Sequence, residues 1–187
     1  MPSTHMYHGK PSISLTGFMF TGKSSVGHRL AFRLGLDFID LDEQIVKEAG
    51  CPITEIFSRG GEAEFRELEH QVLARVVTKP GKLFSTGGGV VLDSRNRELL
   101  LRHSCVIWLI VSPQTVLERL KKSKGKPRPL LEVDDPMTKI CELLAGREKF
   151  YSECDLRIST DGRNVRQVHE EIIAMLKVGI GQQDGNE

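Results

Sequence analysis

Residues 17–24, with the sequence GFMFTGKS, match the pattern G-x-x-x-x-G-K-[ST] that binds nucleotide phosphates between a first strand and a first helix. In such a loop, successive backbone N–H groups at the helix N-terminus surround phosphate oxygens. The Lys23 ammonium adds positive charge at the β- and γ-phosphates, and the Ser24 hydroxyl can bind Mg²⁺. Apolar residues alternate before this segment and recur at helical spacing after it, which disfavours a glycine-rich turn without a ligand. The sequence therefore predicts a nucleotide site.

Two carboxylates, Asp40 and Asp42, stand two residues apart at the end of a predicted strand. In an extended segment both side chains point the same way, toward the edge of the sheet where α/β proteins bind their ligands. One could take part in a Mg²⁺ shell, while the other could orient or deprotonate a hydroxyl nucleophile. An isolated D-x-D motif is more often a solvated loop, but beside a phosphate loop we favour the site.

Three further features could bind ligands, although each has a simpler explanation. Arg66 lies beside the apolar stripe of a predicted helix and could merely pair with Glu62. Glycines 87–89 could let backbone approach a ligand closely, or could form a plain turn. From Arg119 to Arg128, six of ten residues are Lys or Arg, a run that alone suggests a nucleic-acid patch or a solvated face. Because aromatic residues for base stacking are missing from this run, we favour a lid that closes over the phosphates and delivers an arginine.

The elements that must position these residues follow an alternating pattern of short apolar runs and helical segments. This pattern predicts an α/β fold, with a parallel sheet covered by helices on both faces. Ser112-Pro113 and Asp135-Pro136 each mark a helix start, because a capping residue precedes a proline at the first helical position. We expect strands over residues 12–16, 37–41, 82–86, 105–111 and 156–160, and helices near residues 24–34, 61–77, 94–102, 113–122, 136–151 and 165–177.

The chain as a whole is typical of one globular domain. Its 187 residues are 39% hydrophobic and carry a net charge of +1, which gives no bulk field for nucleic acid or membrane. No apolar run approaches the roughly 20 residues of a membrane span. The four cysteines lack metal-binding spacing, so we expect reduced thiols and a cytoplasmic protein. We predict a mobile extension over residues 1–11, a single domain over 12–178 and a mobile tail over 179–187.

Taken in order along the chain, these motifs resemble the shikimate kinase family of small-molecule P-loop kinases. The matching stretches are GFMFTGKSSVG, LGLDFIDLDEQI, ITEIFSRGGEAEFRELE, STGGGVVL, RPLLEVDDP and LLAGREKFY, and the resemblance extends over about residues 12–165, nearly the whole ordered chain. The D-x-D, F-R-x-L-E, T-G-G-G and R-P-L-L segments together are specific to this family, whereas the phosphate loop is not. The resemblance implies a three-layer α/β/α fold like that of nucleoside monophosphate kinases, with a five-stranded parallel sheet. It also implies Mg²⁺-dependent transfer of the γ-phosphoryl of ATP to the 3-hydroxyl of shikimate, in aromatic amino-acid biosynthesis.

The resemblance assigns the acceptor side of the site by position. Asp42 matches the carboxylate that binds the reacting hydroxyls and acts as the base. Arg66 and Arg147 match the pair that holds the substrate carboxylate, and residues 42–75 match the substrate-binding region. The backbone donors around the substrate ring correspond to Gly87, Gly88 and Gly89.

The nucleotide side is implied in the same way. Asp40 matches the carboxylate near Mg²⁺, beside Ser24. Arg128, in a lid over residues 121–133, matches the arginine that reaches the phosphates and acts in catalysis with Lys23. The ATP contacts that the resemblance implies are Phe20, Thr21, Gly22, Lys23, Ser24, Ser25, Arg119, Arg128 and Arg163.

The chain departs from the family at Phe20, where glycine is usual, and mildly at Ser25, where threonine is common. A phenylalanine restricts φ and adds bulk where backbone should wrap phosphate. We expect the loop to keep its shape, because the motif leaves this position open. If the residue is strained, nucleotide affinity should fall by about 1–3 kcal/mol.

Several other functions remain open at this stage. A gluconate or nucleoside monophosphate kinase would share the architecture but should lack the pair of Arg66 and Arg147. A protein that binds nucleotide without turnover is a further alternative. A GTP-driven switch is disfavoured, because the chain contains neither N-K-x-D nor D-x-x-G. A nucleic-acid module is also disfavoured, because the basic run lacks aromatic residues for base stacking. We expect a monomer whose ligands are ATP and shikimate, without a nucleic-acid or membrane partner.

Overall fold

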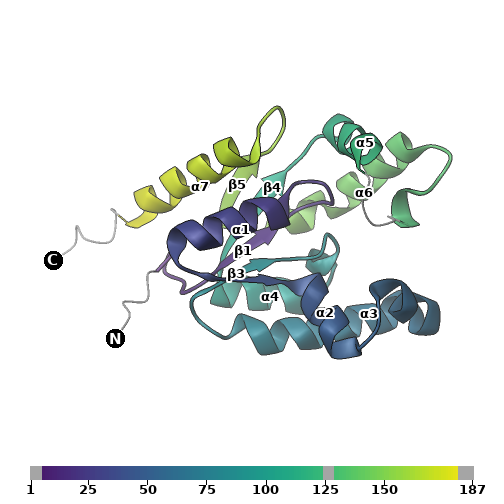
Figure 1. The fold of residues 1–187 in the computed structure, drawn as a ribbon, viewed down its shortest axis with the longest axis horizontal. Helices are drawn as coiled ribbons and strands as arrows, with labels where there is room; N and C mark the ends of the chain where they lie inside the picture. Colours follow the sequence, from purple (N-terminus) through teal and green to yellow (C-terminus); the bar gives the residue numbers. More distant parts are fainter. Residues whose placement is uncertain (1–5, 124–128, 181–187) are drawn as a thin grey trace.

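The structure is a computed structural model that describes residues 6–123 and 129–180 of the chain. At its centre is one sheet of five parallel strands in the order β2-β3-β1-β4-β5, covered by helices on both faces (Figure 1). The strands are β1 Ile13–Thr16, β2 Asp37–Asp40, β3 Lys82–Ser85, β4 Cys105–Ile110 and β5 Leu156–Ser159. The predicted α/β/α fold with a five-stranded parallel sheet is therefore confirmed.

The helix starts predicted from capping residues are also confirmed. Ser112 accepts a hydrogen bond from the backbone N of Thr115, and Asp135 accepts one from the backbone N of Thr138. Of the helices in the two described ranges, none is long and apolar enough to cross a bilayer. The α-helices are α1 Lys23–Leu34, α2 Leu41–Ala49, α3 Ile53–Val77, α4 Ser94–His103, α5 Pro113–Lys122, α6 Pro136–Tyr151 and α7 Val165–Ile180, with short 3₁₀ helices η1 Val90–Leu92 and η2 Pro129–Leu131.

Strand β4 shows why the apolar runs of the sequence become a buried sheet. Its residues Ile107 and Leu109 pack with α1 and α7, whereas Val106 and Trp108 pack with α2, α3 and α4 on the other face. Side chains alternate between the two faces of a strand, so a strand that is covered on both sides must be apolar throughout. The polar residues that carry chemistry are thus left to the ends of the strands.

Two helical segments differ from the prediction. Helix α2 begins where we expected the end of a strand, because Asp40 leaves β2 and caps the helix by accepting a hydrogen bond from the backbone N of Asp42 at 3.1 Å. Helix α3 begins at Ile53 rather than near residue 61. Gly61 departs from helical geometry, with φ 70° and ψ −165°, and kinks α3, so the predicted helix is its second part.

Residues 7–10 belong to the folded domain, which contradicts the prediction that residues 1–11 form a mobile extension. Tyr7 is 3% exposed and packs in the cluster that α1 and α7 form on the sheet. A tight turn through His8 and Gly9, both with positive φ, joins the backbones of Tyr7 and Lys10 by two hydrogen bonds. Burial of the aromatic ring supplies the reason, because it removes a large apolar surface from water. Residues 1–5 and 181–187 lie outside the described residues.

The first glycine of the phosphate loop lies close against the sheet. Gly17 has φ +136°, and a Cβ added to it would lie 2.4 Å from the backbone oxygen of Leu109 in β4. No side chain fits there without a shift of backbone. The path of the loop over the sheet therefore depends on this glycine.

We predict that Gly17→Ala lowers the free energy of unfolding by about 2–4 kcal/mol, because it adds both an unfavourable φ and an overlap with β4. The matched control is Gly146→Ala in α6, where a Cβ would meet nothing within 4 Å. That change should raise the free energy of unfolding by about 0.5–1 kcal/mol, as alanine does inside helices. Urea unfolding followed by circular dichroism measures both. Equal stability of Gly17→Ala and the wild type would contradict the tight contact.

Candidate active site

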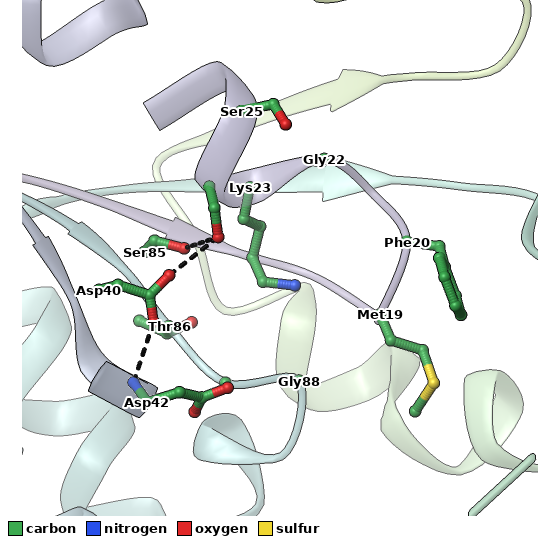
Figure 2. Close-up of a pocket in the computed structure, with 12 residues that line it drawn as sticks. Met19, Phe20, Gly22, Lys23, Ser25, Asp40, Asp42, Ser85, Thr86 and Gly88 are labelled. Atoms are coloured by element: carbon green, nitrogen blue, oxygen red, sulfur yellow. Dashed lines mark hydrogen bonds between the residues drawn. The ribbon is translucent and has the colours of Figure 1, made fainter. Parts of the chain in front are cut away.

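One pocket joins the phosphate loop to the ends of β2 and β3. It is lined by Met19, Phe20, Gly22, Lys23, Ser24, Ser25, Asp40, Asp42, Ser85, Thr86, Gly87 and Gly88. Parallel strands place their carboxyl ends at one edge of the sheet, which is where α/β folds bind ligands. The structure thus brings the predicted phosphate loop, the aspartate pair and the glycine segment 87–89 together (Figure 2).

The phosphate loop holds the Lys23 ammonium on its own carbonyl groups. Lys23 Nζ donates hydrogen bonds to the backbone oxygens of Gly17 and Phe18, each at 2.8 Å, and the side chain is largely buried. The N-cap residue of α1 is Gly22, with φ 87°, so no N-cap side chain competes for the N–H groups of the first turn. These N–H groups and the ammonium together suit an anion.

Ser24, Asp40 and Ser85 form a group of three oxygen-bearing side chains that line the pocket. Ser24 Oγ donates to Asp40 Oδ2 at 2.9 Å and lies 3.2 Å from Ser85 Oγ. Hydroxyl and carboxylate oxygens are the ligands that Mg²⁺ prefers, and Mg²⁺ sites often use few protein groups besides water and phosphate. The group therefore fits Mg²⁺. Sequence reasoning missed Ser85, although its place at the end of a strand beside the glycine segment was a usable signal.

Asp42 occupies a different element from the one predicted. It lies in the first turn of α2 rather than in the strand, so the aspartates are not two side chains of one extended segment. Both still line the pocket, because Asp40 caps the helix that begins with Leu41 and so directs its first turn toward the sheet edge (Figure 2). The two carboxylates therefore lie in the same pocket as expected, but because Asp40 caps α2 and not because both belong to one strand.

Arg66 makes the predicted ion pair with Glu62 and a second, shorter one with Glu69. Its Nη1 lies 2.7 Å from Glu69 Oε2, and its Nη2 lies 3.2 Å from Glu62 Oε1. The side chain of Glu69 is 1% exposed, and burial raises its pKa to about 7 against the opposing effect of Arg66. Glu69 was missed because a glutamate one helical turn from an arginine is usually a surface residue.

Arg147 reaches the same region from α6 and is 7% exposed. Its Nη1 donates to the backbone oxygen of Gly88 at 3.2 Å, and its guanidinium carbon lies 5.7 Å from the centre of the Phe18 ring. Tyr151, one turn later, donates its hydroxyl to the same oxygen, and burial raises its pKa to about 12. Sequence reasoning missed this tyrosine, which the spacing of four residues from Arg147 could have indicated.

The glycine segment 87–89 is the surface on which these groups meet. A Cβ added to Gly87 would lie 3.0 Å from Asp42 Oδ1, and one on Gly89 would lie 2.2 Å from Arg66 Nη2. One on Gly88 would lie 3.4 Å from the backbone N of Met19 in the phosphate loop. Carboxylate and guanidinium groups thus crowd Gly87 and Gly89, whereas a Cβ on Gly88 would make an ordinary contact. The approach of this backbone to a ligand stays a prediction.

The remaining predicted nucleotide residues lie in different surroundings. Thr21 donates its hydroxyl to the backbone oxygen of Phe18, whereas Ser25 is exposed at the pocket. Arg119 donates to the backbone oxygens of Phe20, at 2.6 Å, and Thr160, at 2.9 Å. Arg163 pairs with Glu171 of α7 and is absent from the pocket lining. Arg128 lies outside the described residues, as does much of the predicted lid.

Comparison with known proteins agrees with this arrangement. A family model described as shikimate kinase matches residues 19–177. The shikimate kinase of Thermodesulfovibrio yellowstonii is 42% identical over 162 residues, which are 87% of this chain and 92% of that protein. Over this length, such identity reflects common descent rather than a shared loop motif.

Solved structures give the same result for the fold. The shikimate kinase from Acinetobacter baumannii in complex with shikimate has a TM-score of 0.85 and 32% identity, covering 91% of this chain and 95% of that one. A gluconokinase from Sinorhizobium meliloti has a TM-score of 0.63 and covers 95% of this chain and 98% of its own, but its 16% identity shows a shared fold alone. By sequence and by fold, the chain belongs to the shikimate kinase family.

Proposed function

We propose that the chain transfers the γ-phosphoryl of ATP to the 3-hydroxyl of shikimate, giving shikimate 3-phosphate and ADP. The observation that carries this proposal is one pocket with two chemically different ends. At one end are the phosphate loop and Lys23, and at the other are Asp42, Gly87 and Gly88. Arg66 and Arg147 lie next to this second end, against Gly89 and Gly88. A phosphoryl donor at the first end and a small hydroxy acid at the second would face each other.

At the donor end, the loop is suited to hold the triphosphate before any chemistry occurs. The Lys23 ammonium is already positioned by two carbonyl oxygens, so its charge needs little reorganisation to stabilise phosphate in the transition state. Ser24 and Asp40, with Ser85 beside them, would hold Mg²⁺, which when bound neutralises charge on the β- and γ-phosphates. We propose Arg119 and Arg163 as neighbours of the nucleotide base, and Arg128 as a phosphate contact.

At the acceptor end, Asp42 is the proposed general base. The 3-hydroxyl oxygen attacks the γ-phosphorus, its proton goes to the Asp42 carboxylate, and the bond to the bridging oxygen of ADP breaks with its electron pair. Asp42 Oδ1 faces the Gly87 backbone, where the absence of a side chain leaves room for a substrate ring. The hydrogen bond from its own backbone N to Asp40 places its helical turn.

The two arginines are the proposed binding groups for the substrate carboxylate. Guanidinium groups offer planar pairs of donors that match a carboxylate, and both arginines touch the glycine segment, at Gly88 and Gly89. The ion pair of Arg66 with Glu62 is mostly exposed, so a substrate carboxylate could replace it while the buried pair with Glu69 keeps the guanidinium oriented.

We further propose that the protein acts as a cytoplasmic monomer without a nucleic-acid partner. Its net charge of +1 gives no field for polyanions, and all four cysteines are free thiols. Sedimentation velocity tests the oligomeric state directly.

The proposal is tested by release of ADP from ATP and Mg²⁺ in the presence of shikimate, gluconate or nucleoside monophosphates. We expect turnover with shikimate, and product analysis should find the phosphate on the 3-hydroxyl. Turnover with gluconate or a nucleotide, but not with shikimate, would refute the assignment. Nucleotide binding without any turnover would leave a binding protein.

We predict that Asp42→Asn lowers kcat by about 10²-fold or more, since a general base contributes about that factor. The amide keeps the size of the side chain but cannot accept the proton. Glu43→Gln is the matched control, because it changes an exposed carboxylate in the same turn of α2 and should leave kcat unchanged. Steady-state kinetics with shikimate measures both, and an unaltered kcat in Asp42→Asn would remove Asp42 from proton transfer.

Arg66→Ala and Arg147→Ala should each raise the KM for shikimate by about 10- to 100-fold, because each removes a charge-assisted hydrogen bond to the carboxylate, worth about 1.5–3 kcal/mol. The KM for ATP should change little. Arg59→Ala, which removes an exposed guanidinium paired with Glu64 on the same helix, serves as the control. If the melting temperature fell while both KM values stayed constant, the two arginines would be structural.

The burial of Glu69 predicts a pH-dependent stability. Because its pKa is raised from 4.5 to about 7 on folding, its contribution to stability is full below about pH 4.5 and is lost as the pH rises through 7. The wild type should therefore lose up to about 3 kcal/mol relative to Glu69→Gln between pH 4.5 and 8, at about 1.4 kcal/mol per pKa unit. Urea unfolding of both proteins across this range measures the difference, and a constant difference would show that Glu69 does not titrate there.

A further inference from the structure

Phe20 has a backbone conformation that usually belongs to glycine. Its φ is 63°, and in the part of the chain that the structure describes the other non-glycine residue with positive φ is His8. A bulky side chain in this region strains the backbone, and the conformation persists only where the surroundings hold it. The contacts of Phe20 should therefore explain what holds the middle of the phosphate loop.

The ring of Phe20 packs behind the loop on an apolar cluster that we call the α5–α6 cluster. Figure 2 shows the ring leaving the loop on the side away from Lys23. The buried members of the cluster come from the loop itself, from the segment after β4, and from α5, η2 and α6: Phe18, Val111, Val116, Leu131 and Ile140, with Met19, Leu117, Leu120, Leu143 and Leu144 packed around them.

The backbone of Phe20 is held from the same side. Its carbonyl oxygen accepts a hydrogen bond from Arg119 Nη1 at 2.6 Å, and Arg119 Nη2 donates to the backbone oxygen of Thr160 at 2.9 Å. Thr160 is buried at the end of β5, where its backbone N donates to Ile110 of β4. The guanidinium of α5 thus connects the phosphate loop to the edge of the sheet, independently of the ring.

We propose that Phe20 is a positioning residue for the phosphate loop of this chain. Its ring on the α5–α6 cluster and its carbonyl on Arg119 hold the loop, before the nucleotide binds, in the shape whose N–H groups face the phosphates. A glycine would adopt the positive φ at this position without strain, whereas Phe20 is held in it by the packing behind the loop. The proposal deepens the proposed function and rests on it, since the ligand is the diphosphate or triphosphate tail of a nucleotide.

The experiment measures the Kd of MgADP by calorimetry for the full chain with Phe20, Gly, Ala or Leu at position 20. Phe20→Gly should weaken binding by about tenfold, as expected if the binding-competent loop falls to about a tenth of the molecules. Phe20→Ala should weaken it at least as much, because the methyl group keeps the restriction on φ and loses the packing. Phe20→Leu keeps an apolar side chain on the cluster and should stay within about threefold of the wild type.

A matched control separates positioning from stability. Leu99→Ala truncates a partly buried leucine of α4, which packs in a different cluster from the α5–α6 cluster, so it should lower the melting temperature and leave the Kd of MgADP unchanged. Wild-type or tighter binding by Phe20→Gly would overturn the proposal, because the ring would then contribute nothing to holding the loop in its binding shape. Binding by Phe20→Leu as weak as that of Phe20→Gly would overturn it as well.

A double variant tests the role of the cluster. Leu120→Ala in α5 should weaken MgADP binding severalfold in the wild type and have little further effect in Phe20→Gly, because the ring it supports is gone. Fully additive effects would contradict positioning through the cluster. Failure of the wild type itself to bind MgADP would refute the proposed function, whereas normal binding by the wild type and by Phe20→Gly would refute only the role of Phe20.

Discussion

The site depends on one contact between two pieces of backbone. The glycine segment 87–89 lies directly against the phosphate loop, where a Cβ on Gly88 would come within 3.4 Å of the backbone N of Met19. No side chain separates the two, so groups that bind phosphate and groups that bind an acceptor can belong to one pocket. A second close approach of backbone lies at Gly17, which packs against β4 without a side chain between them. This contact fixes the distance between the phosphate loop and the sheet.

Around this contact the fold buries charges and compensates each one locally. Lys23 lies on carbonyl oxygens, Arg147 on the carbonyl of Gly88 and the Phe18 ring, and Glu69 on the guanidinium of Arg66. Buried charges are costly unless they are paired or hydrogen-bonded, and a carbonyl oxygen satisfies a cation without cancelling its charge. For Glu69 the guanidinium offsets burial only in part, and its pKa is raised to about 7.

The parts that sequence analysis predicted well have signals within a few residues of each other. The phosphate loop is one short motif, and the parallel sheet follows from apolar runs separated by capped helices. The parts it missed depend on contacts between distant segments. Tyr7 looked like part of a polar extension because its partners lie on α1 and α7, and Glu69 looked exposed because the glycine segment that buries it comes later in the chain. Asp42 was assigned to a strand end because Asp40 before it was placed inside the strand, whereas in the structure Asp40 caps the helix whose first turn contains Asp42.

A motif states which residues a loop accepts, but not how the loop is kept in shape. The pattern G-x-x-x-x-G-K-[ST] leaves position 20 open, yet the backbone there has φ 63°, which glycine adopts without strain and phenylalanine does not. A chain can meet that requirement through a residue with free φ or through surroundings that hold a restricted residue in place. Here α5 supplies both apolar side chains for the ring and Arg119 for the carbonyl, so this helix holds the loop at two points. It follows that the conformation of the phosphate loop is stabilised not only by residues 17–24 but also by contacts with the helices packed behind it.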